Sequence, residues 1–223
     1  MISVAIDGPA GAGKSTIAKS VSKKLGFIYV DTGALYRAVG LKFSNLGYDT
    51  ELNCDIDSVL KDTDVTIRFK DGVQRVFLDG EDVSELIRTP NASMMASAVS
   101  AKPSVRAFLL EMQRKLAREN NVVMDGRDIG TVVLPNATVK IFLTASVNER
   151  ATRRYRELTE RGEKVDFNDV LKDMEQRDYN DSHRAIAPLK QADDAVLADT
   201  TEGSFEDSVN LVLGIINERL DNK

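Results

Sequence analysis

ISVAIDGPAGAGKST, residues 2–16, is the most informative stretch of this chain. Apolar residues occupy every second position from Ile2 to Ile6, and a glycine-rich run then ends in Lys14-Ser15, which matches the phosphate-binding pattern G-x-x-x-x-G-K-[ST]. Glycines let a backbone form a concave nest whose N–H groups point at phosphate oxygens, and the positive end of a following helix dipole faces the same anion. The stretch therefore predicts a strand, a phosphate-binding loop and a helix, in that order.

The residues after the loop support this prediction. Ile17, Val21 and Leu25 are spaced by four, as on one face of a helix. We expect Lys14 to reach the β- and γ-phosphates of a nucleotide and the Ser15 hydroxyl to hold Mg²⁺. A glycine-rich turn that binds nothing is the alternative, and the complete motif in its strand–loop–helix context argues against it. By itself the loop indicates a nucleoside triphosphate with Mg²⁺ and no particular reaction.

The composition limits the class of protein. A chain of 223 residues is long enough for one domain with insertions and a sizeable core. No long apolar run is present, which argues against a membrane span, and the start, MISVAID, lacks the basic region and cleavage site of a signal peptide. The single cysteine, Cys54, excludes an internal disulfide and agrees with a reducing cytoplasm. The net charge of −5 argues against broad binding to nucleic acid.

The alternation of apolar patterns predicts an α/β fold. Strands are expected within 27–33 and 121–131, around 139–143 and over 195–199, and helices over 34–47, 85–120, 147–161 and 167–178 and from Ser204 onward. Val65, Ile67 and Phe69 alternate with polar residues, and RVFLDG, residues 75–80, follows after Lys70-Asp71-Gly72, which indicates a hairpin inserted among βα units. We therefore expect a parallel sheet of about five strands with helices on both faces.

Three polar clusters stand apart from the core pattern. The first, Asp125-Gly126-Arg127-Asp128, follows a buried strand, where polar side chains point into the binding crevice of a parallel sheet. Its alternative is a turn whose Asp and Arg pair with each other. The second places Arg177, Asp181 and Arg184 at i, i+4 and i+7, so a continuous helix would carry them on one face. Its alternative is a surface ladder of ion pairs, and His183, off that face, is expected at the surface with no metal role.

The third cluster is a local excess of arginine. Seven of the sixteen arginines lie between Arg150 and Arg184, although the chain as a whole is acidic. Arg150, Arg153 and Arg154 fall on one face of the helix expected over 147–161. A solvated helix face with internal ion pairs is the plain alternative. Phosphoryl transfer, however, needs cations around the transferring group, and a segment that closes over the nucleotide would supply them and exclude water.

At these residues the chain resembles the bacterial cytidylate kinases, a family of nucleoside monophosphate kinases. The resemblance covers essentially the whole length, including the hairpin insertion. It is carried by the segments GPAGAGKST, DTGALYR, DGRDIGT, the arginine-rich helix and RDYNDSHRAIAPL. It implies transfer of the γ-phosphate of ATP to CMP or dCMP with Mg²⁺, on a five-stranded parallel core that carries a monophosphate-binding insertion with a small antiparallel sheet, and a helical lid.

The resemblance also assigns residues. ATP would be held by Gly8, Pro9, Ala10, Gly11, Ala12, Gly13, Lys14, Ser15 and Thr16, with Ser15 toward the metal. The acceptor nucleotide would be held by Thr32, Tyr36, Arg37, Ser97, Arg106, Arg127, Asp128, Arg177, Asp181 and Arg184. Arg150, Arg153 and Arg154 would belong to the lid, and Lys14, Arg127, Arg150 and Arg154 would be catalytic. Thr32 stands where some relatives have Ser, and the hydroxyl is kept.

The residues also suggest how the base is chosen. Cytosine offers an amino donor at N4 and acceptors at N3 and O2, whereas uracil reverses the first two. A carboxylate at N4 and a guanidinium at N3 and O2 fit cytosine and oppose uracil. The candidates are Asp128 and Arg106, with Ser97 and Arg184 as supporting donors.

The implied organisation is one domain over 1–223. Its core would comprise about 1–31, 121–146 and 186–223, its monophosphate-binding region about 32–120, and its lid and acceptor-contacting helices about 147–185. A cytoplasmic monomer with no nucleic-acid or membrane partner is expected. A kinase for UMP or for a non-nucleotide metabolite remains the alternative among enzymes. A GTPase-like switch is disfavoured, because the guanine-reading motif Asn-Lys-x-Asp is absent.

Overall fold

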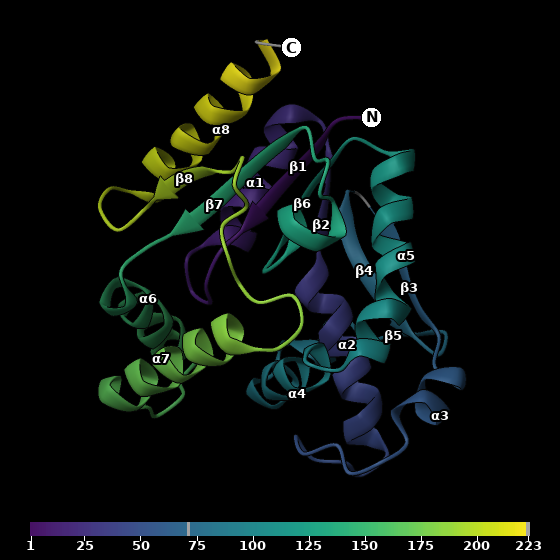
Figure 1. Ribbon diagram of the computed structural model, residues 1–223. Coiled ribbons are helices and arrows are strands. Elements are labelled where there is room, and N and C mark those ends of the chain that lie inside the picture. Colours follow the sequence, from purple (N-terminus) through teal and green to yellow (C-terminus); the bar gives the residue numbers. More distant parts are fainter. Residues whose placement is uncertain (71, 222–223) are drawn as a thin grey trace.

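A parallel sheet forms the centre of the protein (Figure 1). The computed structural model describes residues 1–70 and 72–221. The five strands lie in the order β2-β6-β1-β7-β8, and every neighbouring pair is parallel. Their bounds are β1 Ser3–Asp7, β2 Ile28–Asp31, β6 Val122–Gly126, β7 Val139–Thr144 and β8 Val196–Asp199. The expected five-stranded parallel sheet is thus confirmed, and all five carboxyl ends lie at one edge.

Helices cover both faces of this sheet, as the period-two alternation of its strands requires. Val4 and Ile6 of β1 pack with Ile17 and Val212 in a core beneath α1 and α8, whereas Ala5 between them belongs to the core on the opposite face. That second face is covered by α5 and by a π-helical turn, η2. Their bounds are α1 Lys14–Leu25, α8 Phe205–Asp221, α5 Pro103–Glu119 and η2 Ile129–Val133.

The segment between β2 and α5 builds a separate apolar core. Leu35 and Phe43 of its long helix are fully buried against Met95 and Leu109. A three-stranded antiparallel sheet in the order β3-β4-β5 closes this core. The bounds are α2 Thr32–Asn45, α3 Ile56–Lys61, β3 Val65–Lys70, β4 Val73–Leu78, β5 Glu81–Asp82, η1 Leu86–Arg88 and α4 Pro90–Ser100.

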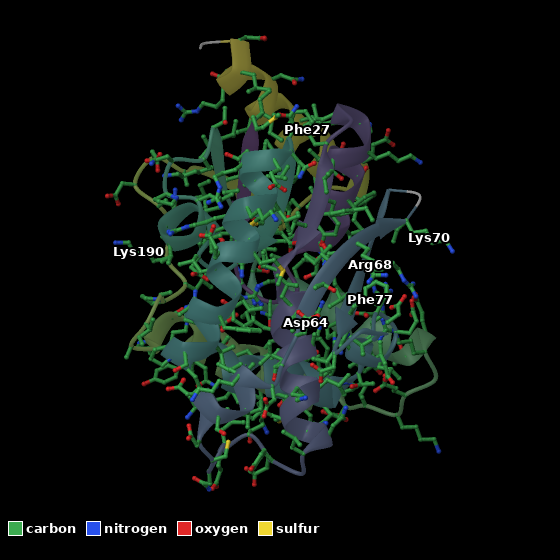
Figure 2. All side chains as sticks on the ribbon, turned by 90° about the vertical axis from the view of Figure 1, so that its right-hand side faces the viewer. Phe27, Asp64, Arg68, Lys70, Phe77 and Lys190 are labelled. Atoms are coloured by element: carbon green, nitrogen blue, oxygen red, sulfur yellow. The ribbon has the colours of Figure 1, made fainter. Side chains whose placement is uncertain are left out.

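The predicted hairpin is the β3–β4 pair. Gly72 has the left-handed φ of +73° that suits a tight turn, while Asp71 lies outside the described residues. On the outer face the Arg68 guanidinium lies 4.4 Å from the centroid of the Phe77 ring, and both side chains are labelled in Figure 2. The inner face of the hairpin packs into the separate core between β2 and α5 through Val65 and Val76.

Two helices follow β7 at the carboxyl edge of the large sheet, α6 Val147–Glu160 and α7 Phe167–His183. They pack on each other through Ala151, Leu158 and Met174. Along the described chain, 1–70 and 72–221, no helix has the length and apolarity to cross a bilayer.

Two expected helices differ from the prediction. The 85–120 segment is divided into η1, α4 and α5, and α5 begins at Pro103, where the missing N–H of proline is tolerated. The helix expected to carry Arg184 ends one residue earlier, and Arg184 caps it with an extended backbone, ψ 141°. The three residues spaced i, i+4 and i+7 therefore do not share one continuous helix.

The packing of α2 on α4 can be tested at Gly40. A Cβ at this position would lie 2.8 Å from Cβ of Met95 and 3.0 Å from its carbonyl carbon, so Gly40→Ala must push the helices apart. We expect the free energy of unfolding to fall by about 1–3 kcal/mol, the usual cost of overpacking. Gly214→Ala in α8 is the matched control, because no described atom beyond its chain neighbours and its own helix backbone lies within 4 Å of the added Cβ. Urea unfolding of both variants measures the difference, and an unchanged Gly40→Ala protein would contradict the packing.

Candidate active site

The candidate site lies at the carboxyl edge of the large sheet. The carboxyl ends of β1, β2 and β6 are adjacent there, because Asp7 pairs with Gly126 and Asp31 pairs with Asp125 in the parallel registers. Parallel sheets bind ligands in the crevice outside this edge. The segments that follow the three strands are the glycine-rich loop, α2 and the Arg127-Asp128 turn, so three of the regions singled out in the sequence meet.

The glycine-rich loop adopts a backbone that only glycine permits. Gly8 has φ +151°, and a Cβ there would lie 1.9 Å from the carbonyl oxygen of Leu143. Gly11 and Gly13 have φ +73° and +86°, and Gly13 is the N-cap of α1. These conformations turn successive N–H groups toward one concave surface at the positive end of the helix. The loop therefore has the geometry of an anion cradle.

One carboxylate organises the polar groups beneath this loop. The Ser15 hydroxyl donates to Oδ2 of Asp125 at 2.9 Å, and the Tyr29 hydroxyl donates to Oδ1 at 2.8 Å. Asp125 is 4% exposed, and its burial, followed by the nearby charge of Asp31, raises its pKa. Since both donors come from other elements, Asp125 ties β6 to α1 and β2.

Lys14 is buried in the same place. Its ammonium group donates to the carbonyl oxygen of Pro9 at 2.7 Å, so the side chain curls over its own loop. Burial lowers the Lys14 pKa, the positive charge of Arg127 lowers it further, and the Asp125 carboxylate opposes both. Beside it, burial raises the Asp7 pKa to about 6, while that carboxylate accepts the backbone N–H groups of η2. An added anion at the cradle would stabilise the ammonium form of Lys14.

A buried group of three charges lies on the far side of the Arg127-Asp128 turn. Asp128 accepts a hydrogen bond from Arg106 through Oδ2 and one from Arg184 at 3.3 Å through Oδ1. The side chains of the two arginines are each 9% exposed, and that of Asp128 is 6% exposed. The Tyr36 ring lies 5.7 Å from the Arg106 guanidinium. Burial raises the Asp128 pKa, and the two arginines oppose that effect.

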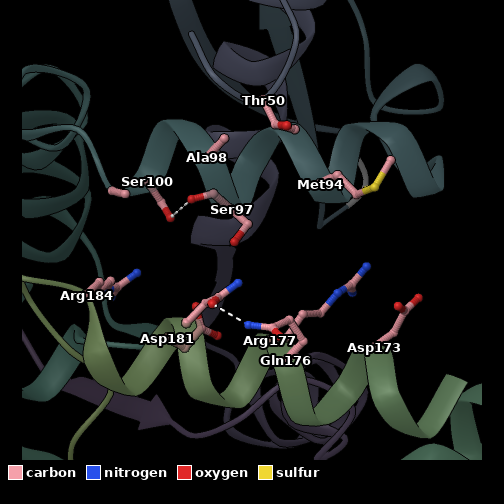
Figure 3. A pocket seen from close by; sticks show the side chains of 12 residues that line it. Thr50, Met94, Ser97, Ala98, Ser100, Asp173, Gln176, Arg177, Asp181 and Arg184 are labelled. Carbon is pink, nitrogen blue, oxygen red and sulfur yellow. Dashed lines mark hydrogen bonds between the residues drawn. The ribbon is translucent and has the colours of Figure 1, made fainter. Parts of the chain in front are cut away.

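A cleft of about 450 Å³ opens beside this charge group, between α4 and α7 (Figure 3). Ser97 lies on its α4 wall, and Arg177, Asp181 and Arg184 lie on the wall formed by α7 and its cap. Arg127 reaches this wall, where its Nε donates to Asp181 at 2.7 Å. Burial lowers the Arg177 pKa, and the neighbouring charge of Arg154 acts in the same direction. The charged side chains that line the cleft are thus two arginines, Arg177 and Arg184, and two carboxylates, Asp173 and Asp181.

The first turn of α2 supplies the remaining predicted residues. The Thr32 hydroxyl donates to the carbonyl oxygen of Asp125 at 2.7 Å, which fixes the start of α2 against β6. Arg37 forms an ion pair of 2.8 Å with Asp31 and is partly exposed. Its remaining N–H donors are available for an anion, because a guanidinium carries five.

The three α6 arginines that are expected in the lid have different surroundings. Arg150 is 4% exposed and donates to the carbonyl oxygen of Ala10 at 3.0 Å and to Asp178. Arg153 donates to the carbonyl oxygen of Thr200 and also pairs with Glu149 on its own helix, and Arg154 pairs with Glu157 on the same helix. Arg150 therefore links the glycine-rich loop to α7, whereas Arg153 and Arg154 have the intrahelical ion pairs that the plain alternative describes.

The structure brings most of the predicted site residues to one edge, on two sides of the Arg127-Asp128 turn. His183 is exposed and stacks on Tyr179, with centroids 4.0 Å apart. Sequence reasoning did not assign roles to Asp125 and Asp178, although both belong to motifs that it quoted. Strand order would have indicated Asp125, which lies one residue before the end of the strand next to the glycine-rich loop. The contact between Asp178 and Arg150 joins two helices and has no signal in the spacing.

Comparisons with known proteins agree on one family. The cytidylate kinase family model matches residues 4–218. The chain is 50% identical over 222 residues to a cytidylate kinase of Caldicellulosiruptor saccharolyticus, across 100% of this chain and 98% of the relative. It is 50% identical over 218 residues to one of Carboxydothermus hydrogenoformans, across 98% of each. A solved gluconokinase from Sinorhizobium meliloti has a TM-score of 0.51 at 13% identity, across 99% of this chain and 94% of that one, which is a likeness of fold alone.

The buried charge group generates a stability prediction. Asp128→Ala leaves Arg106 and Arg184 without their shared carboxylate, and unpaired buried charges are costly. We expect the free energy of unfolding to fall by about 3–5 kcal/mol. Glu111→Ala, which removes the exposed partner of Arg118, should cost less than about 1 kcal/mol. Chemical denaturation at neutral pH compares the two, and equal losses would show that the three charges are not coupled.

Proposed function

The chain belongs to the cytidylate kinase family. On that premise we propose where ATP and the acceptor nucleotide bind. The enzyme transfers the γ-phosphate of ATP to CMP or dCMP and releases ADP with CDP or dCDP. ATP lies on the glycine-rich loop, Gly8 to Thr16. The acceptor nucleotide lies in the cleft between α4 and α7, with its base toward Asp128 and its phosphate toward Arg127 and Arg37.

The observation that carries this proposal is the placement of the Arg106–Asp128–Arg184 group. The group is buried, and it borders the cleft through Arg184. Its carboxylate, Asp128, follows the strand next to the glycine-rich loop. A nucleotide whose base meets this group extends its phosphate toward Arg127, whose charge acts on Lys14 of the loop. The acceptor phosphate and the terminal phosphate of ATP then face each other at the carboxyl edge.

The transfer needs no nucleophile from the protein. A phosphate oxygen of the acceptor attacks the γ-phosphorus of ATP in line, the bond from γ-phosphorus to the β,γ-bridging oxygen breaks, and ADP leaves. The acceptor oxygen already carries negative charge, so a strong general base is unnecessary. Lys14 neutralises charge at the β- and γ-phosphates, and Arg127 and Arg150 neutralise it on the acceptor and leaving sides. Arg153 and Arg154 complete the set from α6 when the helix pair closes over the nucleotide.

The residues beneath the loop also fit Mg²⁺. The Ser15 hydroxyl and the Asp125 carboxylate lie 2.9 Å apart, and oxygen ligands of this kind are those that Mg²⁺ prefers. A divalent cation held there would supply positive charge that stabilises the negative charge developing on the phosphates. Ser15 would provide a hydroxyl ligand, and Asp125, which accepts the hydrogen bond of that hydroxyl, would orient it.

Base choice follows from donors and acceptors at the charge group. The Asp128 carboxylate accepts from N4 of cytosine, and the Arg106 guanidinium donates to N3 and O2, with Ser97 and Arg184 as further donors. Uracil presents O4 to the carboxylate and N3–H to the guanidinium, so both contacts become repulsive. Arg177 and Asp181, on the α7 wall, face the sugar and phosphate. Tyr36 and Thr32 support the acceptor from α2.

In the same proposal the chain divides into an ATP-binding core, a monophosphate-binding region and a lid. The ATP core comprises about 1–31, 121–146 and 186–223, the monophosphate region about 32–120, and the lid with its acceptor-contacting helices about 147–185. We also propose that the enzyme acts as a cytoplasmic monomer on small nucleotides. The single Cys54 suits a reducing compartment.

Lys14 provides the first test of the catalytic assignment. Lys14→Ala removes a cation that acts on the transferring phosphate, and we expect kcat to fall about a thousandfold. Lys24→Ala is the matched control, because Lys24 is exposed on the same helix. Steady-state assays with ATP and CMP, together with circular dichroism to verify folding, measure the effect. Near-normal turnover by folded Lys14→Ala protein would overturn the assignment.

The base-reading residues provide a second test. In Asp128→Asn the amide can turn its NH₂ toward O4 of uracil, so kcat/KM should fall more for CMP than for UMP. Arg106→Met, which keeps the length of the side-chain stem, should also reduce the preference for CMP over UMP. Each mispaired contact is worth about 1–3 kcal/mol, so the CMP:UMP ratio should change by about tenfold or more. The two ratios are measured at saturating ATP. If neither variant alters the ratio, the acceptor base lies elsewhere.

A further inference from the structure

The edge strand β2 ends beside the inserted sheet. Among the described residues, 1–70 and 72–221, β2 pairs with β6 alone in the large sheet, so no described strand lies against the backbone groups on its other side. Such an edge needs other partners to hold its last residue in place. That residue is Asp31, and the chain turns there directly into α2.

A side chain of β4 takes the place of a neighbouring strand at Asp31. The backbone N–H of Asp31 donates to Oε1 of Gln74 at 2.9 Å, and Nε2 of Gln74 donates to the carbonyl oxygen of Asp31 at 3.2 Å. Because one backbone partner donates and the other accepts, the orientation of the Gln74 amide is fixed, with its oxygen toward the N–H and its nitrogen toward the carbonyl. Gln74 therefore makes the same pair of hydrogen bonds with Asp31 that a strand would make, and it makes them from 43 residues away in the chain.

Asp31 transmits this restraint to the proposed phosphate site. Its Oδ1 accepts the N–H of Ala34 at 2.9 Å, which makes it the N-cap of α2. Its Oδ2 accepts from the Arg37 guanidinium at 2.8 Å. A shift of the Asp31 backbone would move both the first turn of α2 and the partner that orients Arg37.

We propose that Gln74 is a positioning residue for the acceptor phosphate: its side-chain amide fixes the end of β2, and Asp31 thereby holds Arg37 where the phosphate of the acceptor binds. This inference rests on the proposed function in one respect, the contact between Arg37 and that phosphate. Gln74 touches no substrate itself. This role assigns a function to the inserted sheet, since Gln74 of β4 holds the end of the core strand β2 by two hydrogen bonds.

The chemistry of Gln74 makes the proposal testable with one substitution. Gln74→Met keeps the length and the apolar stem of the side chain and removes both hydrogen bonds. The measurement is the dissociation constant of CMP and of cytidine, each determined by calorimetry or by competitive inhibition. The ratio of the two constants reports the contribution of the phosphate alone, because cytidine carries the same base and sugar.

We expect Gln74→Met to weaken CMP binding about fivefold to tenfold and to leave cytidine binding and the KM for ATP nearly unchanged. Gln74→Glu keeps the acceptor for the Asp31 N–H but loses the donor, so it should give a similar loss. Gln191→Met is the control, since Gln191 is exposed and makes one hydrogen bond to the Ala195 carbonyl. Thermal unfolding of each variant verifies that it is folded at the assay temperature.

The outcomes separate this proposal from the assignment of Arg37. If Arg37→Ala removes the phosphate contribution and Gln74→Met does not, Gln74 has no positioning role and the acceptor site stands. If Arg37→Ala also leaves that contribution intact, both the site and the role of Gln74 are wrong. Equal weakening of CMP and cytidine by Gln74→Met would show a general structural effect and would likewise overturn the proposal. In the double variant, Gln74→Met should add no further loss to Arg37→Ala.

Discussion

The parallel pairing of β1 with β6 on one side and β7 on the other determines where every candidate binding group lies. It places the end of β1, where the glycine-rich loop begins, beside the end of β6, where Asp125 and the Arg127-Asp128 turn follow. With β2 paired on β6, the start of α2 lies at the same edge. Residues from about 7 to about 128 in the chain thus meet because the strands bring them together, and side-chain contacts such as Ser15 to Asp125 then join them.

This arrangement requires charges to be buried, and pairing makes that tolerable. Asp125, Asp128, Lys14 and Arg106 are all at most 8% exposed. Burial opposes the charged form of each group, and their mutual attraction and hydrogen bonds offset it. The consequence for function is preorganisation: the cations need little rearrangement when the phosphates arrive, which is the condition for strong electrostatic stabilisation of a transferring phosphoryl group.

The local features could be predicted from the sequence, because each depends on neighbouring residues. The loop conformation at Gly8 and Gly13, the start of α5 at Pro103 and the βα alternation all have short-range causes. Contacts that join distant elements could not be predicted, and the positions of Asp178 against Arg150 and of Gln74 against Asp31 became visible only with the packing of helices and sheets. Arg184 shows the limit of periodicity: the spacing was correct, but the helix ends before it. The Asp128 group combines both, since the sequence analysis already named Asp128, Arg106 and Arg184, and only the fold showed that the two arginines share the Asp128 carboxylate.

The central claim is that the protein positions two nucleotides for direct transfer and takes no covalent part. The most direct measurement is the stereochemical course at phosphorus with ATP whose γ-phosphate is made chiral by oxygen isotopes. A single in-line displacement between ATP and CMP inverts the configuration of the transferred group. We predict inversion in the CDP formed. Retention of configuration would mean two successive displacements through a phosphorylated side chain, and it would contradict the account.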